Sequence, residues 1–244
     1  MPLLLALAAE MVLIPAGEFT MGRTKETADD KTTMRPIVLL DDRPAHKVTL
    51  DPFWLDTTEV TQEDYAKFVA ATKHKPPYHW QRGQVPKGEE RFPAYSVDWG
   101  DASAYCAWVG KRLPTEAEWE RAARGGKEAL SYPAADKLDA KSARYGTESG
   151  PGPVGQFAPN GFGLFDMAGG VSEWVSDWFE REYYKSSPAA NPKGPDAGVY
   201  KVIRGGAWSD PAPRCTVFFR NWVRPNQKTP NLGFRCARSI ADPR

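Results

Sequence analysis

Cysteine and histidine are both scarce in this sequence, with three of each among 244 residues. The three histidines, His46, His74 and His79, are too few and too scattered to form a metal-binding triad. An excess of one charge is also missing, because 32 Lys and Arg residues offset 31 Asp and Glu residues to a formal charge of +1. Neither nucleic acid nor an anionic membrane surface is therefore an expected partner.

Long hydrophobic runs are absent as well. No segment approaches the roughly 18 apolar residues of a membrane span, so we predict no membrane-spanning segment. Residues 1–9 are apolar and end in small residues, like the tail of a secretory signal peptide whose basic start is missing. The alternatives are an ordinary first strand or a disordered leader. The expected location is extracytoplasmic, either periplasmic or secreted.

The sequence is rich in proline, glycine and tryptophan. It contains 22 prolines, 21 glycines and nine tryptophans, in a chain that is 41% hydrophobic and 26% charged. The composition is that of a globular protein. Proline and glycine predict long irregular loops, and buried aromatic side chains are suited to hold such loops in place.

The first half of the chain carries most of the regular elements. Residues 11–21 read as a strand, a turn and a second strand, and residues 46–55 alternate like one half-buried strand. Three short helices follow: one starts at Thr61, one covers about 101–109, and one covers 115–124. Beyond Gly125 we predict turns and short strands without a helix of ordinary length. The fold class is therefore α+β with few regular elements.

The third helix has the clearest start signal in the chain. Thr115 and Glu118 have the spacing of a capping box, and Gly125 provides the stop. Acidic and basic residues are interspersed in it and predict a solvated helix face; they are Glu116, Glu118, Glu120, Arg121 and Arg124.

Five segments together resemble the formylglycine-generating, or sulfatase-modifying factor, family. They are residues 11–22 (MVLIPAGEFTMG), 60–68 (VTQEDYAKF), 97–126, 160–178 (NGFGLFDMAGGVSEWVSDW), and the pair 204–208 (RGGAW) with 231–236 (NLGFRC). Each segment alone is a weak signal, but their shared order and spacing make a specific match. The resemblance implies one domain of C-type-lectin-type topology over residues 10–240, low in regular secondary structure.

The resemblance also implies one structural calcium ion. In the family this segment binds Ca²⁺, and the matching positions here are the side chains of Asp166 and Glu173 and the carbonyl groups of Gly169 and Val171. Oxygen ligands of this kind suit Ca²⁺. The alternative is that both carboxylates cap turns and pair with a nearby arginine. A second calcium site is not expected, because Arg144 stands where the resemblance calls for an asparagine ligand.

The cysteines match the family only in part. Cys106 and Cys236 resemble a disulfide pair of the family, which export would keep oxidised. Two separate buried thiols are the alternative. The copper-dependent members have a second cysteine pair after the Gly-Gly segment. Counted forward from Gly206, Asp210 takes the first of these positions and Cys215 the second; counted back from Arg220, Cys215 takes neither.

One copper ligand is thus missing under either alignment. A carboxylate is a hard ligand that cannot replace a thiolate on Cu(I), so neither copper nor copper-dependent formylglycine formation is expected.

Two functions remain open from the sequence. The first is a non-catalytic module that binds a peptide, a protein or a small molecule in a groove formed by residues 208–230. Its expected contacts are Trp208, Arg214, Arg220, Trp222 and Arg224. The alternative is an oxidoreductase that uses a single thiol or another metal, with Cys215 as the reactive group and Asp210 as a base. Phe218, Phe219 and Trp222 have a competing interpretation as core residues, and we expect at least two of them to be buried.

Overall fold

The computed structural model describes residues 10–25 and 41–240, so the predicted signal-peptide remnant at 1–9 lies outside the described residues. The two strands predicted over 11–21 are present as β1 (Met11–Ile14) and β2 (Gly17–Met21), but they do not pair with each other. β2 pairs with β3 (His46–Leu50), and β1 pairs with β4 (Phe53–Asp56). The single strand predicted over 46–55 is therefore wrong: the chain breaks at Asp51 and Pro52 and enters two different sheets.

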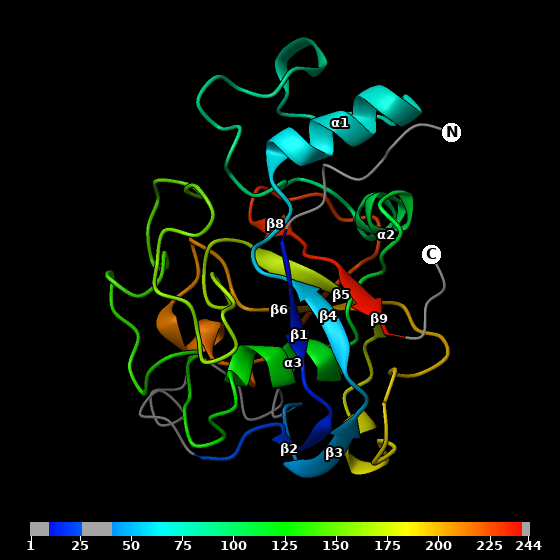
Figure 1. Cartoon of the computed structure of the whole chain (residues 1–244), viewed down its shortest axis with the longest axis vertical. Helices are drawn as coiled ribbons and strands as arrows, with labels where there is room; N and C mark the ends of the chain where they lie inside the picture. Colours follow the sequence, from blue (N-terminus) through cyan, green and yellow to red (C-terminus); the bar gives the residue numbers. More distant parts are fainter. Residues whose placement is uncertain (1–9, 26–40, 241–244) are drawn as a thin grey trace.

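The largest sheet lies behind β4 and joins segments from the second half of the chain. Its strand order is β7 (Asn221–Val223), β6 (Lys201–Arg204), β5 (Ser172–Trp178) and β8 (Leu232–Gly233), with β5 and β8 parallel. A further strand, β9 (Ala237–Ser239), completes the sheet β1-β4-β9. The first and last described strands thus lie on the two sides of β4 (Figure 1).

The helices begin where their capping residues predict. α1 (Gln62–Thr72) starts after Thr61, and α3 (Glu116–Arg124) starts after Thr115 with a complete capping box and ends at Gly125, which has φ 57°. α2 (Trp99–Trp108) starts two residues earlier than predicted, because Asp98 and Asp101 form a second capping box. Beyond Gly125, the only helical elements among the described residues are the 3₁₀ turns η4 (Tyr183–Lys185) and η5 (Ala212–Cys215), so no helix of ordinary length follows, as predicted; η3 (Gln81–Gly83) precedes them.

The charged residues of α3 are not solvated, and that prediction is wrong. The helix lies in the middle of the molecule (Figure 1), and Glu120 has no exposed surface. Each charged side chain has a hydrogen-bond partner, and several of the partners come from distant parts of the chain. Glu120 accepts hydrogen bonds from Arg124 at 2.6 Å and Arg204 at 2.7 Å, and Glu116 accepts from Arg220 at 2.7 and 2.9 Å. A charge can be buried when such partners satisfy it.

Buried hydrophobic side chains form two large clusters, one that includes Trp119 of α3 and one that includes Tyr65 of α1 and Tyr105 of α2. The disulfide between Cys106 and Cys236 ties α2 to the segment before β9, as predicted. Phe218 and Phe219 are buried, which confirms their interpretation as core residues, whereas Trp222 is partly exposed.

The result is one α+β domain with little regular structure. Within the described residues, no helix combines the length and the apolar character that crossing a membrane requires.

Candidate functional site

The loop after β6 is built on two glycines in left-handed conformations. Gly205 has φ 91° and Gly206 has φ 68°. A Cβ atom on Gly206 would approach Cys215 Sγ to 2.8 Å, so the bare backbone allows Cys215 to pack beneath the loop. The loop is also joined to the segment 169–170, because Gly169 N–H donates to the Gly205 carbonyl at 3.0 Å and Trp208 N–H to the Gly170 carbonyl at 2.8 Å. The predicted calcium-binding segment and the predicted groove are therefore neighbours.

Cys215 is a free, buried thiol. It has no exposed surface, and burial together with the carboxylate of Asp210 raises the pKa of its thiol to about 12. Its Sγ faces the Pro211 carbonyl at 3.9 Å. At neutral pH the sulfur keeps its proton, whereas the thiolate is the nucleophile and metal ligand.

Asp210 does not form an acid–base pair with Cys215 in the part of the chain that the structure describes. Its carboxylate accepts hydrogen bonds from Ala207 N–H at 3.0 Å and Arg214 at 3.0 Å. Asp210 thus closes the turn after the Gly-Gly segment, and the side chain of Arg214 remains half exposed.

The predicted ligand contacts fall into two groups with different neighbours. Trp208 lies beside Pro230, to whose carbonyl its Nε1 donates at 3.5 Å, and Arg214 lies beside Asp210. Trp222 stacks on Phe179 with ring centroids 4.2 Å apart, and Arg224 lies 5.5 Å above the ring of Tyr200. All four side chains are at least partly exposed.

Arg220 requires a correction. We predicted it as a ligand contact, but it has no exposed surface, and its guanidinium binds both carboxylate oxygens of Glu116. It stabilises the core instead of facing a groove. The four pockets described for residues 10–25 and 41–240 also have no lining residue from 208–230.

The predicted calcium segment contains an excess of negative charge. Glu173 is fully engaged: both its oxygens accept from Arg235 at 2.7 Å, and one accepts from Trp119 Nε1 at 2.9 Å. Asp166 accepts from Gly155 N–H at 2.5 Å and has a left-handed backbone, with φ 56°. Burial raises the pKa of Asp166.

Glu59 adds a third carboxylate that the sequence interpretation missed. It is 1% exposed, and its Oε2 has no hydrogen-bond partner, with the nearest cation, Arg235, 3.9 Å away. Burial and the carboxylate of Asp166 raise the pKa of Glu59 well above its ordinary value. A single glutamate before the cap of α1 carries no periodic signal, so only the structure relates it to Asp166.

Two buried carboxylates, Glu59 and Glu173, and the partly buried Asp166 thus share the one guanidinium of Arg235. Either protons or a bound cation must offset the remaining charge. A hard divalent cation suits such oxygen atoms, so the residues fit calcium. In the described residues no three His, Cys, Asp or Glu side chains already converge to hold a metal ion. The predicted ligand set relies in part on the carbonyl groups of Gly169 and Val171.

Comparison with known proteins defines the class first: residues 5–240 match the family model described as "Sulfatase-modifying factor enzyme 1-like domain". A solved structure with the same fold, that of PvdO from Pseudomonas aeruginosa, matches with a TM-score of 0.78 and 32% identity over 95% of each chain. The formylglycine-generating enzyme of Streptomyces coelicolor is 35% identical, over 93% of this chain and 88% of that protein. The chain belongs to the sulfatase-modifying factor family.

Other relatives differ in activity and in length. A mouse protein named "Inactive C-alpha-formylglycine-generating enzyme 2" is 31% identical, over 96% of this chain and 87% of its own length. The serine/threonine-protein kinase pkn1 of Chlamydia pneumoniae is 35% identical over 95% of this chain, but the chain spans only 38% of that protein. Proteins named as a formylglycine-generating enzyme, as an inactive form of it and as a protein kinase thus all contain a region similar to this chain.

Proposed function

We propose that this chain is a binding member of the sulfatase-modifying factor family, which recognises a peptide or protein segment at the surface formed by residues 208–230 and does not form formylglycine with copper. The observation that carries the proposal is the state of the thiols. Two of the three cysteines form the disulfide, and the third, Cys215, is buried with a raised pKa. A two-thiolate Cu(I) site would need a second free sulfur, and Asp210 supplies oxygen instead.

The exposed side chains of this surface support recognition. Trp222 and Phe179 present a stacked aromatic pair, and Arg214 and Arg224 extend from the same segment of chain into solvent. Tryptophan and arginine are enriched at the energetic centres of protein interfaces. A relative that is named as inactive supports the idea that a family member can keep the fold without the catalytic activity.

Two measurements on the purified protein test the proposal. In the first, Cu(I) and a Cys-x-Pro-x-Arg peptide are added and the peptide mass is followed; no oxidised product is expected. Copper-dependent product would overturn the proposal, and loss of that product in Cys215→Ser would favour the oxidoreductase alternative.

In the second, peptides selected on the protein from a phage-displayed library are titrated by fluorescence anisotropy. Trp222→Ala is expected to weaken binding about tenfold or more, with Tyr78→Ala, another exposed aromatic residue, as the matched control. Equal binding to wild type and Trp222→Ala would show that this surface is not the site.

We also propose that Ca²⁺ binds beside this surface, held by Asp166, Glu173 and the carbonyl groups of Gly169 and Val171, with Glu59 as an additional carboxylate. The orphaned Oε2 of Glu59 supports this proposal. Calcium should raise the melting temperature by several degrees over an EGTA-treated sample, because a ligand that binds only the folded state stabilises it. Glu59→Gln should reduce that increase, while Glu90→Gln, at an exposed position, should leave it intact. An unchanged melting temperature in EGTA would contradict the site.

An extracytoplasmic location completes the proposal. The disulfide supports it, because such bonds persist in oxidising compartments. Fractionation of the source cells, with this protein in the cytoplasmic fraction, would contradict it.

A further inference from the structure

A second concave site lies away from the surface formed by residues 208–230. It is a cavity of about 820 Å³ between the start of α2, the start of α3, β9 and the loop 191–193. In Figure 1, α2 and β9 lie on the right, whereas the orange turn η5 lies on the left. The lining combines seven apolar residues with nine polar or charged ones; the apolar ones are Leu50, Pro52, Phe53, Trp99, Leu113, Pro192 and Ile240. This size and composition are typical of pockets for small molecules.

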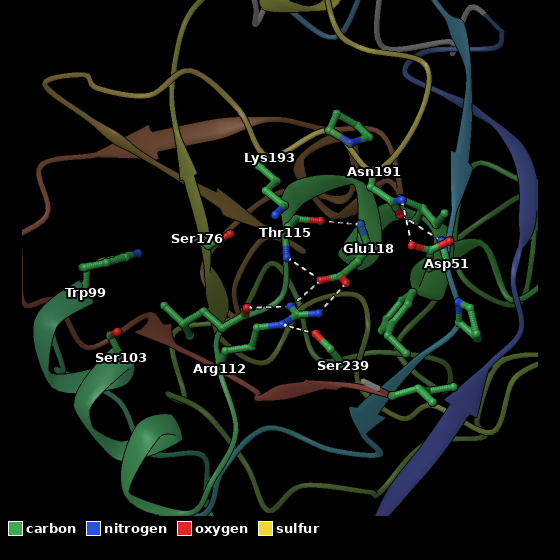
Figure 2. A pocket seen from close by; sticks show the side chains of 16 residues that line it. Asp51, Trp99, Ser103, Arg112, Thr115, Glu118, Ser176, Asn191, Lys193 and Ser239 are labelled. Atoms are coloured by element: carbon green, nitrogen blue, oxygen red, sulfur yellow. Dashed lines mark hydrogen bonds and ion pairs between the residues drawn. The ribbon is translucent and has the colours of Figure 1, made fainter. Parts of the chain in front are cut away.

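Most polar groups of the cavity are already engaged with one another. Arg112 donates to Glu118 at 2.6 and 2.7 Å and to Ser239 at 3.0 Å, and Asp51 accepts from Asn191 at 3.0 Å. Figure 2 shows the Arg112 pairs in its lower part and the Asp51–Asn191 pair on the right. The Arg112–Glu118 pair is neutral overall, whereas Asp51 is paired with the uncharged amide of Asn191 and places a negative charge on that side of the cavity.

Lys193 differs from the other charged lining residues. It is exposed, and no hydrogen bond or ion pair engages its ammonium group within the described residues. Figure 2 shows the side chain extending toward Ser176 and Thr115 on the wall of the cavity. A second ammonium group lies behind that wall, because Lys201 donates to the Ser176 carbonyl at 2.7 Å and lies 4.1 Å from the Trp99 ring.

Lys193 thus places a positive charge on the Ser176 side of the cavity, opposite the side that carries Asp51, and Lys201 adds a second positive charge behind that wall. Trp99, on the same side, offers an aromatic surface next to this charge. We propose that the cavity binds a small aromatic molecule that carries a single acidic group, with the acid at Lys193 and the aromatic body against Trp99, Leu113 and Phe53. The site is separate from the peptide surface proposed above, so either proposal can fail without the other.

The probe for this site is 1-anilinonaphthalene-8-sulfonate, an aromatic acid whose fluorescence rises in apolar surroundings. N-phenyl-1-naphthylamine has the same aromatic body without the sulfonate and provides the uncharged comparison. We expect saturable one-to-one binding of the acid to the folded protein. Lys193→Gln should weaken it about two- to fivefold, as the loss of an exposed ion pair predicts, and should leave binding of the uncharged probe unchanged.

Three further variants locate the site. Ser103→Phe places a ring in the cavity and should weaken both probes more than tenfold; if it does not fold, the two probes with Lys193→Gln still decide. Lys137→Gln, at another exposed lysine, and Trp222→Ala, on the peptide surface, should leave both affinities unchanged. The proposal is overturned if the sulfonate does not bind, if Lys193→Gln affects both probes equally or neither, or if Trp222→Ala alone weakens binding.

Discussion

At the scale of single residues, Asp177 is a buried acid whose charge state should affect stability. It is 3% exposed and accepts hydrogen bonds from Glu116 N–H at 2.9 Å and Ser176 Oγ at 3.0 Å. Burial, and next the carboxylate of Glu116, raise its pKa to about 7. Between pH 4 and 7 the folded protein therefore holds a proton that the unfolded chain has released. The contribution of this residue to stability falls as pH rises through that window and levels off above it.

Asp177→Asn removes this titration. We expect the free energy of unfolding of the variant, relative to wild type, to be higher at pH 7.5 than at pH 5, by up to a few kcal/mol. Urea denaturation at the two pH values measures the difference. Asp196→Asn, at an exposed position, should have the same free energy of unfolding relative to wild type at both pH values. If Asp177→Asn also shows no difference between the two pH values, the raised pKa of Asp177 is contradicted.

At the scale of elements, the capping box of α3 positions the helix that carries the buried ionic cluster. Thr115 Oγ1 accepts from Glu118 N–H at 3.1 Å, and the Glu118 carboxylate accepts from Thr115 N–H at 2.8 Å. Thr115→Ala should lower the free energy of unfolding by about 1 kcal/mol, measured by chemical denaturation. Thr147→Ala, in a loop where the hydroxyl bonds only Ser149, should cost less than half as much. Equal losses would show that the cap adds nothing specific.

The elements also show how far the sequence alone can predict this protein. The starts of α1 and α3 were predictable, because the caps Thr61 and Thr115 act within one turn of the chain, whereas the capping box that starts α2 at Asp98 was missed. Strand pairing was not, since β1 and β2 are consecutive yet pair with different partners. The burial of Glu116 and Glu120 was also missed, because their partners Arg204 and Arg220 lie more than 80 residues away. The candidate sites followed the same rule: Asp166 and Glu173 share one sequence segment, whereas Glu59 reaches them only through the fold.

At the scale of the whole molecule, the disulfide joins two distant parts of the chain. Cys106 and Cys236 are 130 residues apart and both have no exposed surface. Cross-linking so long a loop restricts the unfolded chain, and loss of such a bond costs about 2–5 kcal/mol. A Cys106→Ser, Cys236→Ser double variant should therefore unfold at markedly lower denaturant concentration than wild type.

The thiol count checks the same bond independently of stability. In denaturant without reductant, an alkylating agent should label one cysteine of the wild type, Cys215, and all three after reduction, as read by intact mass. Without denaturant Cys215 should resist labelling, because its sulfur is buried and protonated. Cys215→Ala is the matched control: it removes a buried thiol and leaves the bridge, so its midpoint should stay closer to wild type than that of the double variant. Three labelled thiols without reductant would mean that the bridge does not form, and that the long loop is held closed by packing alone.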